Sequence, residues 1–184
     1  MLEVCIRRIW IGQVMWIAFI WIRCSMLLNK LAGVALVGLM LVAAGFSMAD
    51  EAKEVAFPKL PQGAGKIDEN APKTFTTTKS GLKYRILRVG TGAKPSARQK
   101  VEVHYHGWLD NEKVFDSSYE RKESISFGLN QVIAGWTEGM QHVNEGGMVE
   151  LEIPSNLGYG DRGSPPVIPP KAQLHFLVEL IDVK

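Results

Sequence analysis

The chain has 184 residues and a nearly balanced charge, with 21 Lys and Arg against 19 Asp and Glu. This balance argues against a nucleic-acid-binding protein, because such proteins normally carry an excess of basic residues on one face. Both cysteines, Cys5 and Cys24, lie near the N-terminus. The rest of the chain therefore offers no disulfide, no thiolate nucleophile and no cysteine-based metal site.

Residues 1–49 have the character of an apolar targeting segment. An uncharged apolar run, residues 31–46, follows Lys30, and the small residues Ser47 and Ala49 come next. This order is typical of a secretory signal peptide and predicts cleavage after Ala49. The run is shorter than the roughly 20 residues that cross a bilayer comfortably. The alternative is that residues 31–46 stay uncleaved as an inner-membrane anchor.

A second apolar stretch, residues 9–22, lies upstream and is not needed by a signal peptide. Met26 begins a complete n-region of its own, so we expect translation to start there and residues 1–25 to be a spurious extension. The rival interpretation is a two-helix membrane hairpin.

Residues 50–73 predict a flexible linker. The stretch is polar and is broken by prolines and glycines, with neither helical nor alternating periodicity. It is too short to form a domain. The globular domain is therefore expected over residues 74–184.

Alternation of apolar and polar residues dominates residues 74–184 and indicates β-strands. The pattern predicts five of them, near residues 82–87, 101–106, 125–127, 149–153 and 174–183. The last of these has apolar residues on both faces, so we expect it to be covered on both sides.

One stretch suits a helix, because its apolar residues recur with a period of 3.6. These residues are Ile133, Trp136, Met140 and Val143. Gly135 and Gly139 weaken the helix, so it should be short and held by packing. The expected fold class is α+β, a curved antiparallel sheet wrapped around one short helix.

Five short motifs occur in order along this region. They are Val103-His104-Tyr105-His106-Gly107, Val114-Phe115-Asp116-Ser117-Ser118, Gln131-Val132-Ile133-Ala134-Gly135-Trp136, Leu157-Gly158-Tyr159-Gly160 and Val167-Ile168-Pro169-Pro170. Their order and spacing resemble the signature of the FKBP family, and the sequence around them resembles bacterial exported members. The resemblance implies a β half-barrel, peptidyl-prolyl cis-trans isomerase activity, and no cofactor or metal ion.

The resemblance also implies a shallow apolar pocket between the sheet and the helix, with Trp136 as its floor. Its catalytic residues would be Tyr105, Phe115, Asp116, Ile133, Trp136, Tyr159 and Phe176. Its other substrate-binding residues would be Val132, Ile125, Arg121, Val167 and Ile168, of which the last two would lie on an overhanging loop. Ile125, Gln131, Ser164 and Val167 depart from the best-known members, which leaves substrate preference and inhibitor affinity open.

Such a pocket suits rotation about an X–Pro bond, because this reaction breaks no covalent bond. The barrier of about 18–20 kcal/mol comes from amide resonance, which makes the planar amide more polar than the twisted one. A dry aromatic pocket therefore disfavours the planar amide more than it disfavours the twisted amide. Hydrogen bonds from the Tyr159 hydroxyl and the Ile133 N–H that fit only the twisted form would add differential binding.

Two other patterns are weaker. Gly158 to Gly163 match G-x-G-x-x-G, but prolines on both sides prevent the helix that a dinucleotide site requires. His104 and His106 share a strand face, but no acidic or cysteine ligand lies near them in sequence, so an exposed pair is favoured over a metal site.

The function we expect is therefore isomerisation of proline-containing, unfolded or partly folded polypeptides in the periplasm or another exported location. Macrolide inhibitors are candidate ligands, nucleic acid is not, and a monomer is expected. The alternative is a non-catalytic holdase chaperone or proline-peptide binding module that uses the same pocket.

Overall fold

The computed structural model describes residues 53–184. The predicted signal segment, the start at Met26 and the alternative membrane anchor lie outside the described residues. From residue 53 to the C-terminus, the structure contains no helix of the length and apolarity needed to cross a membrane.

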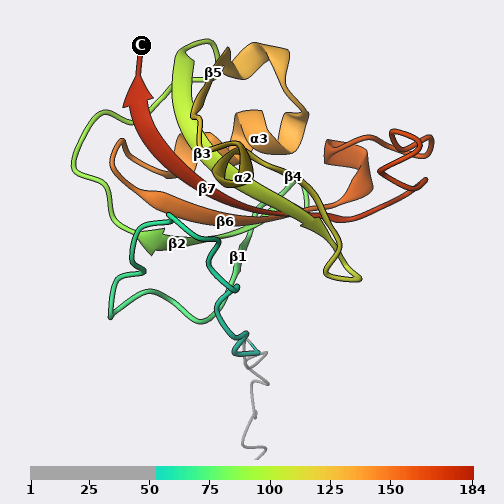
Figure 1. Ribbon diagram of the computed structural model, residues 1–184, viewed down its shortest axis with the longest axis horizontal. Coiled ribbons are helices and arrows are strands. Elements are labelled where there is room, and N and C mark those ends of the chain that lie inside the picture. Colours follow the sequence, from blue (N-terminus) through green and yellow to red (C-terminus); the bar gives the residue numbers. More distant parts are fainter. Residues whose placement is uncertain (1–52) are drawn as a thin grey trace, which may run out of the picture. The chain divides into compact units, whose positions relative to one another are not determined.

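A seven-stranded antiparallel sheet forms the body of this region (Figure 1). The strands are β1 (Thr76–Thr77), β2 (Lys83–Arg88), β3 (Lys100–Leu109), β4 (Val114–Ser117), β5 (Ile125–Gly128), β6 (Met148–Ile153) and β7 (Leu174–Val183). They are ordered β1-β2-β6-β7-β3-β4, and β5 also pairs with β3. The five predicted strands are confirmed within a few residues. The sequence did not reveal β1 and β4, because β1 has only two residues and the sequence of β4, Val-Phe-Asp-Ser, does not alternate.

The predicted helix is confirmed as α3 (Ala134–Gly139), which continues into the 3-10 turn η2 (Met140–His142). Two further 3-10 turns are η1 (Leu129–Gln131) and η3 (Ser155–Leu157), and a single helical turn, α2 (Ser118–Arg121), follows β4. Gly135 lowers the helix propensity of α3, but a side chain there would collide with Ile153 of β6. The glycine therefore lets the helix approach the sheet closely.

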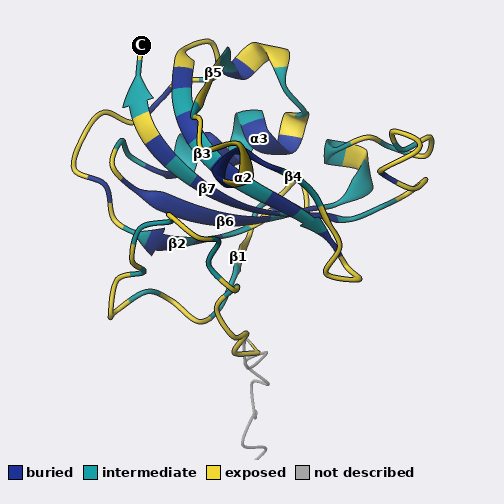
Figure 2. Ribbon diagram, viewed as in Figure 1, coloured by how far each residue is buried: buried dark blue, intermediate teal, exposed yellow. Residues whose placement is uncertain are grey.

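The main core lies between α3 and the inner face of the sheet, where buried residues run along β3, β6 and β7 (Figure 2). Alternation along β3 directs Val103 and Tyr105 into this core and leaves His104 on the other face. The expected curved sheet around one short helix is thus present, with α2 as an additional single turn.

Residues 53–73, named here the N-terminal strap, have no helix or strand but are packed against the outer face of the sheet. The Asp68 N–H donates to the Leu87 carbonyl at 2.8 Å, and the Gly65 N–H donates to Glu179 Oε1 at 2.7 Å. The prediction of a flexible linker is therefore wrong for these residues, and the folded unit begins before residue 74. In Figure 1 the strap lies on the side of the sheet opposite α3.

A buried arginine explains much of the packing of the strap against the sheet. The Arg85 side chain on β2 is buried, and its Nε donates to Glu150 Oε2 at 2.6 Å. Its other nitrogens donate to the carbonyls of Val55 and Ala56, both at 2.7 Å. Burial raises the pKa of Glu150, although Arg85 opposes this. Because a buried guanidinium must have its donors satisfied, the strap backbone completes the site that β2 and β6 begin.

A small apolar cluster on the outer face also holds the strap. Leu87, Met148 and Leu177 are fully buried there, and Leu60 and Ile67 of the strap pack on them. The expectation that the last strand is covered on both faces is confirmed at Leu177, whereas Ile181 further along is 41% exposed.

Candidate functional site

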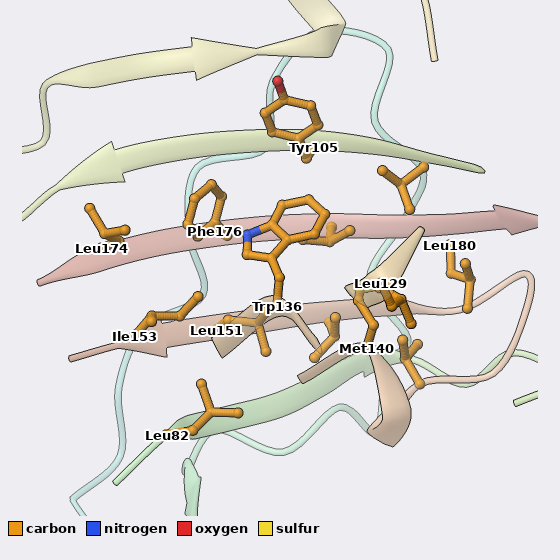
Figure 3. Packing of buried hydrophobic residues seen from close by; sticks show 14 of the residues in the cluster. Leu82, Tyr105, Leu129, Trp136, Met140, Leu151, Ile153, Leu174, Phe176 and Leu180 are labelled. Atoms are coloured by element: carbon orange, nitrogen blue, oxygen red, sulfur yellow. The ribbon is translucent and has the colours of Figure 1, made fainter. Parts of the chain in front are cut away.

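Four aromatic residues that the sequence analysis selected gather on the inner face of the sheet. Trp136 of α3 lies at their centre. Its ring centre is 5.5 Å from the ring centre of Tyr105 on β3 and 5.2 Å from that of Phe176 on β7, and both pairs are edge-to-face. Phe115 of β4 extends the group, because its ring lies 5.4 Å from Phe176. Figure 3 shows the indole beside the Phe176 ring and below the Tyr105 ring. Four different elements of the fold thus form one aromatic cluster.

Phe127 of β5 also belongs to this cluster and was not selected from the sequence. Its ring lies 5.4 Å from Trp136. It faces inward because β5 pairs with β3 in a register that places Phe127 opposite the buried Val101. Alternation placed Phe127 on a strand, but only this pairing decides what the residue contacts.

Gly107 keeps the aromatic cluster closely packed. A Cβ atom at this position would lie 2.7 Å from Phe115 Cζ and 2.8 Å from Phe176 Cε1. Both distances are far inside van der Waals contact, so any side chain would push these two rings apart. The glycine of the first motif therefore has a packing role within the candidate site.

A polar triad borders the cluster. The Tyr105 hydroxyl donates to Asp116 Oδ2, and Arg121 Nη1 donates to Asp116 Oδ1. Arg121 Nη2 also donates to the Tyr105 hydroxyl oxygen at 2.9 Å, and its guanidinium carbon lies 5.6 Å from the Tyr105 ring centre. Each of these residues is thus bonded to the other two.

The triad shifts the acidity of its members. Burial raises the pKa of Tyr105, and the hydrogen bond to Asp116 raises it further. Partial burial acts to raise the pKa of Asp116, but the hydrogen bonds from Tyr105 and Arg121 outweigh it and hold this pKa below its usual value. At neutral pH the triad therefore contains a neutral phenol, a carboxylate and a guanidinium.

Ser118, which the sequence analysis did not select as a site residue, attaches α2 to β3. Its Oγ accepts a hydrogen bond from the Tyr105 N–H at 2.8 Å and donates to the Tyr105 carbonyl at 3.2 Å. The serine is fully buried. Its position immediately after Asp116-Ser117 was the available signal, but the partner on β3 could not be inferred from it.

The remaining selected residues lie beside the cluster or at its edge. Val132 and Ile133 are partly buried and pack against the core, and Ile133 occupies the N-cap position of α3 without a side-chain capping hydrogen bond. Within residues 53–184, neither the Ile133 N–H nor the Tyr159 hydroxyl has a hydrogen-bond partner. Ile125, Tyr159 and Val167 are 40%, 43% and 43% exposed.

Ile168 and Val167, the two residues expected on the overhanging loop, differ in burial. Ile168 is 6% exposed and belongs to the core cluster, whereas its neighbour Val167 points to solvent. Its N–H donates to the Ser164 carbonyl at 2.9 Å, which closes the intervening loop. Ile168 thus belongs to the same buried cluster as Tyr105, Trp136 and Phe176, and the overhanging position expected for it stays a prediction.

Other candidate chemistries find little support in residues 53–184, where no cluster of three or more His, Cys, Asp and Glu could hold a metal ion. His104 and His106 lie on the outer face, and their Nδ1 atoms are 2.9 Å from Ser118 Oγ and 3.1 Å from Ser117 Oγ. The glycine pattern from Gly158 to Gly163 follows η3 in a series of turns and does not begin a helix.

A hollow of about 1080 Å³ lies on the outer face of the sheet. It is bounded by the strap around Phe57, by outer-face residues such as His106 and Trp108, and by Tyr119 of α2. Because residues alternate along β3, this hollow is on the opposite side from Tyr105 and is separate from the aromatic cluster.

The fold and the cluster define a small α+β domain with an aromatic surface at the junction of sheet and helix, bordered by a Tyr–Asp–Arg triad. Comparison with known proteins gives the family. The family described as FKBP-type peptidyl-prolyl cis-trans isomerase matches residues 91–181, and the chain belongs to this family.

Among curated relatives, a probable FKBP-type peptidyl-prolyl cis-trans isomerase of Haemophilus influenzae is 49% identical over 111 residues, which cover 60% of this chain and 46% of the relative. The crystal structure of FkpA from Escherichia coli superposes with a TM-score of 0.58 at 45% identity and covers 60% of this chain and 51% of that chain. A Pseudomonas syringae peptidyl-prolyl cis-trans isomerase structure gives a TM-score of 0.56 at 38% identity, covering 60% of this chain and 80% of that chain.

The chain spans less than half the length of the first curated relatives it matches, 46% of the Haemophilus influenzae protein and 41% of Escherichia coli FkpA. The similarity is therefore a similarity of the domain around the aromatic cluster.

Proposed function

We propose that this protein is a peptidyl-prolyl cis-trans isomerase that accelerates rotation about X–Pro bonds in polypeptides. The single observation that carries the proposal is the cluster of Tyr105, Phe115, Trp136 and Phe176, gathered from four elements beside the Tyr105–Asp116–Arg121 triad. Membership of the FKBP-type family supports the same activity.

The aromatic rings supply the surface on which a proline ring would pack. Trp136 and Phe176 are each 5% exposed, so water has little access to these rings. A substrate amide held against them loses contact with water, and the planar amide loses more by this because it is more polar than the twisted one. The free-energy barrier to rotation falls by the difference between the loss for the planar amide and the loss for the twisted amide.

Hydrogen bonding adds to this effect when it fits only the twisted amide. We assign it to the Tyr159 hydroxyl and the Ile133 N–H, which have no partner within residues 53–184 and can each donate to a substrate carbonyl. Asp116 and Arg121 hold the Tyr105 ring in place. Lowering the barrier by about 4–7 kcal/mol would accelerate rotation by roughly 10³–10⁵-fold.

Proline-limited refolding of a reporter protein tests the proposal. The purified wild-type protein should accelerate the slow phase, and Asp116→Ala and Tyr159→Phe should each accelerate it less. If the slow phase has the same rate with and without the wild-type protein, the isomerase assignment is wrong. Suppression of aggregation that persists in both variants, without acceleration by the wild-type protein, would instead indicate a holdase.

We further propose that the protein acts outside the cytoplasm, because the pattern over residues 31–49 is that of a signal peptide. Its substrates would then be exported proteins that are still folding. Macrolide binding and a monomeric state are proposed with it. Fractionation into soluble and membrane fractions, together with N-terminal sequencing of the mature protein, tests export and cleavage after Ala49.

A further inference from the structure

We propose that Tyr119 and Glu179, on the outer face of the sheet, are positioning residues for the candidate active site. Their hydrogen bond would hold α2 in the orientation that places Arg121 against Tyr105 and Asp116. This inference rests on the proposed isomerase function and extends it to residues that do not touch the aromatic cluster.

Glu179 is the meeting point of three elements on the outer face. Its Oε1 accepts hydrogen bonds from the Tyr119 hydroxyl at 2.6 Å and from the Gly65 N–H of the strap at 2.7 Å. Its Oε2 accepts one from Arg88 Nη2 at 2.7 Å. Glu179 lies on β7, which is paired on both sides by β3 and β6. Glu179 therefore offers a fixed attachment point for α2.

The turn α2 cannot hold its own orientation, because it has four residues and a single turn of isolated helix is unstable. Two neighbouring side chains attach it instead. Ser118 bonds to the backbone of Tyr105 on β3, and Tyr119, which is 7% exposed, reaches Glu179 on β7. Two attachments to different strands fix both the position and the rotation of the turn.

Arg121 lies two residues after Tyr119, which corresponds to about 200° around a helix of 3.6 residues per turn. The two side chains therefore leave α2 on nearly opposite sides. Tyr119 points to the outer-face carboxylate, and Arg121 points to Asp116 and the Tyr105 hydroxyl. A rotation of α2 that frees Tyr119 would move Arg121 away from the triad.

Removal of the Tyr119 hydroxyl tests the hydrogen bond to Glu179 separately from the packing of the Tyr119 ring. The Tyr119 ring also stacks on His104 with ring centres 4.9 Å apart, and a Tyr119→Phe variant keeps that packing. Glu179→Gln keeps the shape of the side chain and removes its charge. Ile67→Ala is the matched control, because Ile67 packs on the outer apolar cluster and has no part in the hydrogen bonds of α2.

The test measures isomerase kcat/KM and the titration of the Asp116 carboxyl by NMR in the full chain, at a temperature where each variant is folded. We expect Tyr119→Phe and Glu179→Gln to lower kcat/KM by about threefold to tenfold, as expected for the loss of one hydrogen bond. We also expect the Asp116 pKa to rise toward its usual value, because Arg121 withdraws. In an Arg121→Ala background, Tyr119→Phe should have no further effect on kcat/KM.

The inference is wrong if Tyr119→Phe leaves both kcat/KM and the Asp116 titration unchanged in a protein whose wild type is active. The inference is also wrong if Ile67→Ala, when it lowers stability as much as Tyr119→Phe does, causes the same losses. The losses would then follow from general destabilisation. If the wild type has no isomerase activity, the proposed function fails. The Asp116 titration still decides whether Tyr119 positions Arg121.

Discussion

The Tyr105 hydroxyl donates a hydrogen bond to Asp116, and this bond joins the aromatic cluster to a half-exposed carboxylate at its edge. The ring of Tyr105 is buried against Trp136, while its oxygen is held by Asp116 and Arg121. One residue therefore belongs to both the apolar and the polar parts of the candidate site. Its orientation depends on residues from β4 and α2.

Replacement of Asp116 by Asn should reduce activity more than stability. The variant loses the charge that holds Tyr105 and Arg121, and charge-assisted hydrogen bonds contribute about 1.5 kcal/mol or more. We expect kcat/KM to fall by about tenfold, with a small change in unfolding free energy because the carboxylate is 42% exposed. Urea unfolding and proline-limited refolding measure the two effects. Glu69→Gln in the exposed part of the strap is the control and should change neither.

Replacement of Gly107 by Ala should lower both stability and activity. The new methyl group would lie where the Phe115 and Phe176 rings now approach, 2.7 and 2.8 Å from their nearest atoms. Overpacking of this kind costs about 1–3 kcal/mol, and displacement of the rings should also weaken substrate binding and raise KM. An unfolding free energy equal to that of the wild type would show that the cluster has room that its distances do not suggest.

Replacement of Arg85 by Ala should be among the most destabilising charge changes in the chain. It leaves the Glu150 carboxylate buried without its partner and removes the donors that bind the strap. Loss of one member of a buried ion pair costs about 3–5 kcal/mol.

Lys83→Ala is the matched control for this change, because Lys83 lies on the same strand and pairs with Glu152 while its side chain is 49% exposed. It should cost less than about 1 kcal/mol. Urea unfolding compares the two, and limited proteolysis should cut the strap faster only in Arg85→Ala. Equal losses in both variants would contradict the structural role given to Arg85.

Glu179 should make stability depend on pH in the acid range. Burial acts to raise the pKa of Glu179, but hydrogen bonds from Tyr119, Arg88 and Gly65 outweigh it and lower this pKa. Because the folded pKa is below the unfolded one, Glu179 stabilises the fold above about pH 4.5, the usual value, and this contribution is lost as pH falls through the folded pKa.

The measurable consequence is a comparison of wild type with Glu179→Gln by urea unfolding at several pH values. The variant should be less stable than the wild type at neutral pH. The difference should shrink as pH falls, because a protonated glutamate and a glutamine are both neutral. A difference that stays constant with pH would show that the carboxylate charge contributes nothing to folding.

The local periodicity of the sequence was enough to predict many of the strands and the helix of this protein. Alternation along residues 101–106 and 174–183 identified two central strands and the side chains on their inner faces, including Tyr105 and Phe176. The period of 3.6 identified a helix that presents Trp136 to them. Short-range periodicity carries this information because each strand or helix must turn its apolar side toward the core.

Only the tertiary structure decided which residues meet. The register between β3 and β5 directs Phe127 to Trp136, and the attachment of α2 brings Arg121 to Tyr105. The donors of Arg85 bind the carbonyls of a strap that had the composition of a linker. These contacts join residues of different elements. They depend on strand register and on the need of buried polar groups for partners, and no local pattern of residues encodes either.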